Sequence, residues 1–253
     1  MDLFGWGDGV GCHRLKRYSY IAAIIVMIVI TAFFSCSIFF YGRCTQYKPK
    51  DLDAFRCMDL PENIMKIFWS KNKEDKGQLI EKAMGKPWYK YYQTVLNDVE
   101  YFPIAEDIVG HETTAFDNAW LSERTYGGKR FHEGTDIMTS NNKRGYFKVM
   151  SMTDGIIEKK GWLEKGGYRL GIRSKSGGYY YYAHLYEYAP ELEEGSQVKA
   201  GQFLGTVGDS GYSKIEGTVG NFDVHLHIGI YLDIDGKETS INPYWILKYL
   251  KAS

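Results

Sequence analysis

The sequence VHLHIGI, at residues 224–230, alternates two histidines with apolar residues. Successive side chains of a β-strand point to opposite faces, so His225 and His227 would share one face and the apolar residues the other. By itself this pattern fits the polar face of a half-buried strand equally well. A metal-binding or catalytic interpretation therefore depends on partners elsewhere in the chain.

The composition sets the class of protein. The chain has 253 residues, of which 44% are hydrophobic and 16% aromatic, which is enough for a packed core. Its formal net charge is 0, so no basic domain points to nucleic acid as a partner. The 28 glycines and 21 tyrosines, concentrated in the second half, predict many short strands joined by tight turns. The C-terminal half is expected to be mainly β.

Four cysteines, at positions 12, 36, 44 and 57, all lie in the first quarter of the sequence. None has the paired spacing of a zinc finger, and the second half of the chain contains no cysteine. A disulfide scaffold or a cysteine-bound structural zinc is therefore disfavoured there. A disulfide between Cys44 and Cys57 stays open if both lie in an oxidising compartment.

Residues 19–41 contain no charged side chain. A helix of about 22 residues spans about 33 Å, enough to cross a hydrocarbon core of about 30 Å. The apolar stretch is longer than that of a signal peptide, so we expect an uncleaved single-pass anchor in the cell membrane. The basic residues clustered just before this stretch favour a cytoplasmic segment 1–18 and an extracytoplasmic C-terminal domain; they are Arg14, Lys16 and Arg17.

Residues 42–100 differ in composition from the apolar stretch before them and are rich in charged and amide side chains. Apolar residues at helical spacing predict short helices that form a stalk or a cap, and the clearest such run is Trp88, Tyr92, Val95, Leu96 and Val99. A loosely packed spacer is the simpler interpretation. A cap that covers a binding groove until it is displaced is the alternative.

From residue 101 to residue 253 the pattern changes to short β-like runs with glycine punctuation. His132 and Asp136 would lie about 13 Å apart on a fully extended strand. Two ligands of one zinc ion must converge at about 2.0–2.2 Å from the metal, so the chain has to bend between them. Gly134 is placed to allow that bend. Successive antiparallel strands are expected at 155–158, 168–173 and 179–185, and the last of these carries His184.

Together, His132-x-x-x-Asp136, Ala183-His184-Leu185 and His225-x-His227 resemble the signature of the lysostaphin-type (LytM-type) zinc endopeptidases of bacterial cell walls. The resemblance covers roughly residues 101–245. It implies a mainly antiparallel β-sheet peptidase domain over 101–253, with the site in a groove between loops.

The resemblance also implies roles for five residues. His132, Asp136 and His227 match the ligands of one zinc ion, and His184 and His225 match the catalytic histidines. Three protein ligands leave a fourth position open, as catalytic zinc requires. The expected reaction is hydrolysis of an amide bond in the peptide part of peptidoglycan. His225 would help to take the water proton, and His184 would stabilise the oxyanion or protonate the leaving amine.

The sequence departs from the family pattern around the last motif. Val224 stands where a proline is common, Ile228 stands where an aromatic residue is frequent, and the segment 209–223 is longer than the usual connection. These changes bear on substrate specificity more than on metal binding. They keep open a second function: a non-catalytic, membrane-anchored scaffold or wall-binding protein in a division or sporulation complex. The sequence does not identify protein partners.

Overall fold

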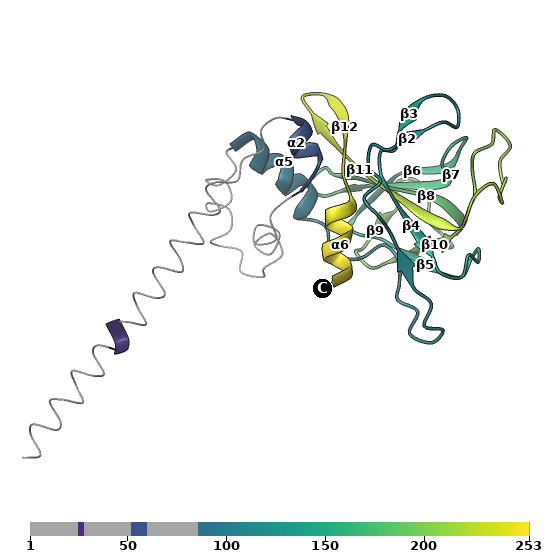
Figure 1. Ribbon diagram of the computed structural model, residues 1–253, viewed down its shortest axis with the longest axis horizontal. Coiled ribbons are helices and arrows are strands. Elements are labelled where there is room, and N and C mark those ends of the chain that lie inside the picture. Colours follow the sequence, from purple (N-terminus) through teal and green to yellow (C-terminus); the bar gives the residue numbers. More distant parts are fainter. Residues whose placement is uncertain (1–24, 28–51, 60–85, 253) are drawn as a thin grey trace, which may run out of the picture. The chain divides into compact units, whose positions relative to one another are not determined.

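The computed structural model describes residues 25–27, 52–59 and 86–252 (Figure 1). The chain divides into two compact units, 1–48 and 49–253. Apart from helical residues 25–27, the predicted membrane helix at 19–41 lies outside the described residues, as do residues 60–85 of the predicted stalk and Cys44. Within the three described ranges, no helix is both long enough and apolar enough to cross a membrane.

A ten-stranded antiparallel sheet forms the body of the second unit (Figure 1). Its main path runs β1-β4-β11-β8-β7-β6-β9; β12 pairs with β11, and β10 pairs with β5 and β8. A separate hairpin pairs β2 with β3. The strands are β1 Thr114–Ala115, β2 Glu123–Arg124, β3 Arg130–Phe131, β4 Thr135–Thr139, β5 Lys148–Met150, β6 Gly155–Leu163, β7 Gly167–Ser174, β8 Tyr179–Tyr188, β9 Gln197–Val198, β10 Phe203–Val207, β11 His225–Ile234 and β12 Lys237–Ile241.

The three predicted antiparallel strands are confirmed as β6, β7 and β8, each longer than its sequence pattern indicated. The mainly β, antiparallel fold class of the C-terminal part is confirmed with them. The stretch 224–230 opens β11, which lies between β4 and β8 in the middle of the sheet. A central strand brings its neighbours' side chains within reach on both flanks, and this is the position that a convergent site needs.

The two faces of the central strands differ. In β8, Tyr180 and Tyr182 are fully buried on one face. In β11, Leu226, Ile228 and Ile230 are fully buried, as strict alternation requires. The opposite face carries His227, Tyr181 and other residues that line a cavity. One face therefore forms the hydrophobic core, and the other forms the floor of the candidate site.

Helix α5 (Lys86–Leu96) packs on the core face. Its residues Tyr92, Val95 and Leu96 are at most 1% exposed, at the spacing of one helical face. The Tyr180 hydroxyl donates a hydrogen bond of 2.6 Å to the Val95 carbonyl. The predicted helical run is thus confirmed as far as Leu96. Val99 lies beyond the helix end, in an isolated bridge to Thr153.

Two further helices flank the sheet (Figure 1). The short α2 (Leu52–Arg56) contacts β12, and Arg56 Nε donates to the Ser240 carbonyl at 3.0 Å. The C-terminal α6 (Tyr244–Ala252) follows Asn242 and Pro243, and the Asn242 side chain caps its start by accepting a hydrogen bond from the Tyr244 amide at 3.0 Å. In Figure 1 these helices lie apart from the β2–β3 hairpin.

Candidate metal centre

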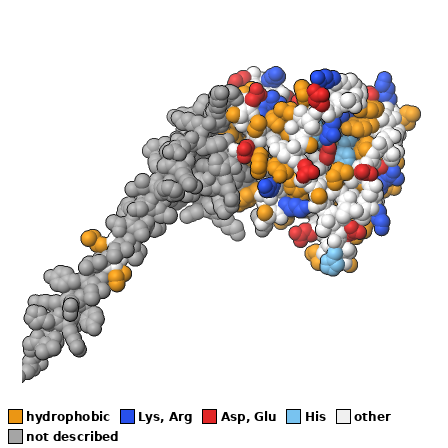
Figure 2. Space-filling model, in the orientation of Figure 1, with side chains coloured by type: hydrophobic (Ala, Val, Ile, Leu, Met, Phe, Trp, Pro, Cys, Tyr) orange, Lys and Arg blue, Asp and Glu red, His pale blue; other side chains and the backbone are white. Residues whose placement is uncertain are grey.

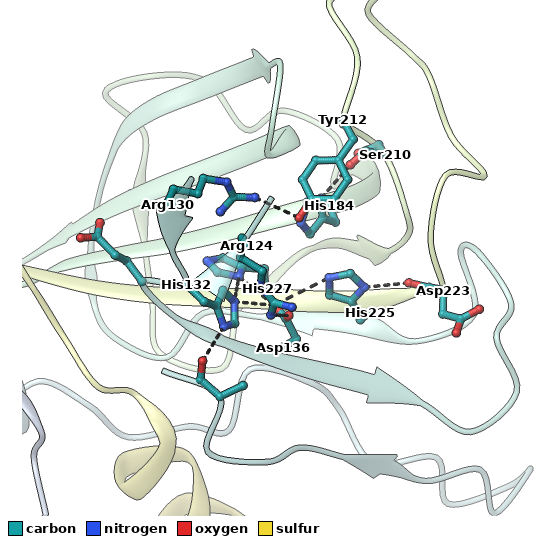
Figure 3. Close-up of polar contacts among 12 residues, drawn as sticks. Arg124, Arg130, His132, Asp136, His184, Ser210, Tyr212, Asp223, His225 and His227 are labelled. Carbon is teal, nitrogen blue, oxygen red and sulfur yellow. Dashed lines mark hydrogen bonds and ion pairs between the residues drawn. The ribbon is translucent and has the colours of Figure 1, made fainter. Parts of the chain in front are cut away.

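Three side chains converge on one point above β4 and β11. His132 Nε2 lies 3.0 Å from Asp136 Oδ1 and 3.0 Å from His227 Nδ1, and His227 Nδ1 lies 2.8 Å from Asp136 Oδ1 (Figure 3). Among the described residues these form the one group of histidine, cysteine and carboxylate side chains close enough to hold a metal ion together. The structure therefore brings together the three residues predicted to bind zinc.

Strand pairing places two of the three candidate ligands. His227 of β11 is the direct cross-strand partner of Asp136 in β4, so both side chains leave the same face of the sheet. The chain bends between β3 and β4, as predicted, and this bend brings His132 over the same point. Gly134 lies at the bend because a Cβ there would come within 2.5 Å of Cε1 and Nε2 of His227. The glycine is needed for the close approach of the imidazole ring.

Two further contacts orient the candidate ligands His132 and Asp136. The His132 Nδ1–H donates to the Ala119 carbonyl at 3.1 Å, which leaves the Nε2 lone pair directed at the cluster. Arg124 of β2 donates from Nη2 to Asp136 Oδ2 at 2.8 Å. One carboxylate oxygen is thereby held by the guanidinium and the other faces the two imidazoles, an arrangement that favours monodentate binding of a metal by Oδ1.

The electrostatics of the cluster favour an ionised aspartate. Burial opposes ionisation of Asp136, but the close contacts of its carboxylate with His132 and His227 hold the pKa of its carboxyl far below its usual range. Burial also lowers the pKa of the His227 imidazole, against the opposing effect of Asp136. An ionised carboxylate beside neutral imidazoles is the protonation state in which all three groups bind a metal.

The donor set fits zinc. Nitrogen and oxygen ligands about 2.0–2.2 Å from a tetrahedral zinc lie about 3.4 Å apart, and the three atoms here are 2.8–3.0 Å apart, so small outward shifts accommodate the ion. With His132 Nδ1 already donating, its Nε2 presents a lone pair toward Asp136 Oδ1, another acceptor. Acceptors that face one another in a half-buried site are stabilised by a cation between them.

The two other predicted residues lie beside this cluster. His225 Nε2 is 3.7 Å from Asp136 Oδ1, and its Nδ1–H donates to the Asp223 carbonyl at 2.7 Å. The ring centroids of His184 and His225 are 4.8 Å apart. His184 Nδ1–H donates to the Ser210 carbonyl at 2.8 Å (Figure 3). Each of these imidazoles thus has Nδ1 fixed by a backbone carbonyl and Nε2 available for other contacts.

A β-bulge directs His184 into the site. Strict alternation along β8 would place His184 on the core face with Tyr182. However, Tyr168 pairs with Leu185 and Leu170 pairs with Tyr182, so two residues of β8 lie opposite one residue of β7. His184 also has a left-handed backbone, with φ of 64°. The bulge moves its side chain to the open face, where burial lowers the pKa of the imidazole well below its usual value.

A cavity of about 370 Å³ opens over the cluster, and pale blue histidine side chains reach the surface of this domain in Figure 2. Its lining includes His132, Asp136, His184 and His227. Tyr212 of the long segment 209–223 also lines it, and the ring centroids of Tyr212 and Phe222 lie 5.8 Å and 4.7 Å from that of His184. Neither α2 nor α5 contributes to the lining.

Several residues of the site were not predicted. Arg124 belongs to none of the sequence motifs and lies 12 positions before Asp136, so their contact is seen only once the β2–β3 hairpin has folded. The carbonyls of Ala119, Ser210 and Asp223 orient three histidines, and backbone acceptors leave no trace in a sequence. Tyr212 lies in the segment 209–223, which is longer than the usual connection in the family. That extra length is the signal in the sequence that could have pointed to Tyr212.

A mainly β domain with a histidine–aspartate–histidine cluster, an open cavity and two adjacent imidazoles has the features of a metallohydrolase. The family model "Peptidase family M23" matches residues 130–243, which include all five predicted site residues. A solved structure from Ruminococcus gnavus, provisionally named as the glycyl-glycine endopeptidase lytM, is 39% identical, with a TM-score of 0.68, over 84% of this chain and 96% of that one. The chain belongs to peptidase family M23.

Two other relatives are more partial matches. The L-Ala–D-Glu endopeptidase of Bacillus subtilis (strain 168) is 42% identical over 130 residues, 51% of this chain. The match spans only 38% of the length of that curated relative. The catalytic domain of lysostaphin from Staphylococcus simulans is 24% identical, with a TM-score of 0.40, over 55% of this chain and 94% of that one.

Proposed function

We propose that this protein is a membrane-anchored, zinc-dependent endopeptidase that hydrolyses amide bonds in the peptide part of bacterial peptidoglycan. The convergence of His132 Nε2, Asp136 Oδ1 and His227 Nδ1 beneath an open cavity carries the proposal. The names of two relatives give it a substrate class, because one is an L-Ala–D-Glu endopeptidase and the other is provisionally a glycyl-glycine endopeptidase.

One zinc ion per domain would be held by these three atoms. When bound, zinc supplies Lewis acidity toward a peptide carbonyl and makes water acidic enough to lose a proton near neutral pH. Arg124 keeps Asp136 ionised and oriented, and the Ala119 carbonyl keeps His132 in the tautomer with Nε2 unprotonated. These residues prepare the ligands and take no part in proton transfer.

The two remaining histidines divide the proton transfers. His225 presents an unprotonated Nε2 beside the metal-binding oxygen of Asp136, so it accepts the proton of the attacking water. His184 is buried and its pKa is lowered, so a proton that reaches its Nε2 is readily given up to the leaving amine. The proton that His225 takes from the water passes to His184, whose ring lies 4.8 Å away, and from there to the leaving nitrogen. The carbonyl carbon gains a bond to the water oxygen, and the C–N bond breaks.

Mass spectrometry of peptidoglycan digested by the purified full chain tests this reaction. We expect fragments with new amino and carboxyl termini, no new reducing sugars, loss of activity with a chelator and recovery with zinc. Intact peptides, together with retention of the chain on the wall, would contradict the peptidase proposal and support the non-catalytic alternative.

Residues 19–41 support the anchoring part of the proposal, because they form an uncharged apolar stretch of the length of a membrane span. With the basic cluster before it inside the cell, residues 101–253 would face the wall. Protease treatment of intact cells after removal of the wall is expected to digest the C-terminal part. A fully protected C-terminal part would contradict this topology.

A further inference from the structure

The cavity has a positively charged wall that metal binding does not explain. Arg130 of β3 and Lys165 of the β6–β7 turn both line the cavity together with the metal-site residues. Within the described ranges, neither side chain forms an ion pair. The acidic lining residues are Asp136, which is engaged by Arg124 and the two imidazoles, and Glu133. The wall therefore carries two unpaired cations against one unengaged carboxylate.

The Arg130 guanidinium is held in position by neutral groups. Its Nε donates to the Tyr126 carbonyl at 3.3 Å, and its Nη2 donates to the Tyr212 hydroxyl at 3.2 Å. The rings of Tyr126 and Tyr212 stack with centroids 4.6 Å apart, which links the β2–β3 hairpin to the long segment 209–223. A guanidinium has five N–H donors, so three remain for a ligand. A fixed guanidinium of this kind suits bidentate binding of a carboxylate.

Both cations lie on the same side of the cavity as His184. Tyr212, which accepts the hydrogen bond from Arg130, lies with its ring 5.8 Å from the ring of His184. Lys165 precedes Gly166, whose carbonyl accepts a hydrogen bond of 2.8 Å from the His184 amide. In Figure 3 the Arg130 side chain extends toward Tyr212 and His184 above the metal cluster. An acidic group bound there would be close to the scissile amide.

We propose that Arg130 and Lys165 form a carboxylate-binding subsite that selects peptides with an acidic residue next to the scissile bond. This inference rests on the proposed endopeptidase function and narrows its substrate class. The subsite would favour cleavage of an L-Ala–D-Glu bond over cleavage of a bond between two glycines, because only the first bond flanks an acidic residue. A neutral neighbour would leave the partly buried guanidinium without the partner that its geometry accommodates.

Paired synthetic peptides test the subsite. The two peptides share one sequence, are amidated at the C-terminus, and differ only in Glu or Gln beside the scissile bond. We expect the zinc-loaded full chain to cleave the Glu peptide with a kcat/KM at least about tenfold higher. Arg130→Gln should remove most of this preference by lowering kcat/KM for the Glu peptide far more than for the Gln peptide. Arg130→Lys should give an intermediate preference, because it keeps the charge and loses the planar fork.

The neighbouring cation provides a matched control. Lys129 has a side chain that is 76% exposed, pairs with Glu123 at 3.0 Å and does not line the cavity. Lys129→Gln removes the same charge from the same hairpin and should leave the preference as in the wild-type chain. Equal cleavage of both peptides by the wild-type chain, or an equal loss on both peptides in Arg130→Gln, would overturn the subsite.

A binding measurement separates this inference from the peptidase proposal. Calorimetric titration of the chelator-treated full chain with each peptide should show tighter binding of the Glu peptide, dependent on Arg130. Such binding without cleavage by the zinc-loaded chain would support the subsite and contradict the peptidase function. Cleavage without preference in binding or in rate would support the peptidase function and overturn the subsite.

Discussion

Gly134→Ala is expected to abolish tight zinc binding without removing any ligand. The added Cβ would lie 2.5 Å from both Cε1 and Nε2 of His227 and 2.5 Å from the carbonyl oxygen of Ile228. Ordinary contact begins near 3.4 Å, so the ring or the backbone has to move by about 0.9 Å. Metal–ligand distances tolerate only about 0.2 Å. The His227 nitrogen therefore leaves its bonding position, and we expect zinc affinity to fall at least about 100-fold.

Competition with a chromophoric chelator measures this affinity directly. Gly128→Ala is the control: this glycine has a φ of 100° in the β2–β3 turn, and a Cβ added to it would meet nothing within 4 Å. It therefore carries the strain of a glycine substitution without contact with a ligand. Zinc affinity of Gly134→Ala within a factor of about three of the wild-type value would refute the proposed reason for this glycine.

Three further changes have expected outcomes. Arg124→Gln should lower zinc affinity by about 10–100-fold in the same competition assay, because Asp136 loses the group that orients its Oδ2 atom. Unchanged affinity would show that Arg124 does not orient Asp136 for metal binding. Leu96→Ala should lower the free energy of unfolding in urea by about 2–5 kcal/mol, since this side chain is 1% exposed, and should leave zinc stoichiometry at one. Glu158→Gln should reduce the free energy of unfolding at pH 7, because the hydrogen bond from Arg173 lowers the pKa of the Glu158 carboxyl. This stabilisation of the wild-type chain is lost as the pH falls through the folded-state pKa, so the two chains should be equally stable in strongly acidic buffer. A difference that stays constant with pH would contradict the role of this ion pair.

The sequence predicts the convergence of His132, Asp136 and His227 because its geometric constraints are local, whereas their role as metal ligands is implied by the family resemblance. Alternation puts His225 and His227 on one face, and a single bend unites His132 with Asp136, so periodicity and one glycine define most of the geometry. The expected reason for the glycine was incomplete. Backbone freedom suggested the bend, but the space taken by the imidazole of His227 explains why no side chain is tolerated.

His184 shows where periodicity fails. A strict period of two along β8 assigns this histidine to the core face. The bulge opposite Arg169 reverses that assignment, and a bulge depends on the pairing of two strands, which a single segment does not specify. Similarly, Arg124 and Arg130 join the site through the β2–β3 hairpin, whose position over β4 is a tertiary property.

The most direct test of the central claim combines zinc analysis with peptidoglycan digestion for three forms of the full chain. We predict that the wild-type chain binds one zinc ion and cleaves peptide amides. His184→Ala should still bind one zinc ion and release no fragments, whereas His227→Ala should lose both zinc and activity. Full zinc binding by His227→Ala, or wild-type digestion by His184→Ala, would contradict the proposed division between a metal ligand and a proton-transfer residue.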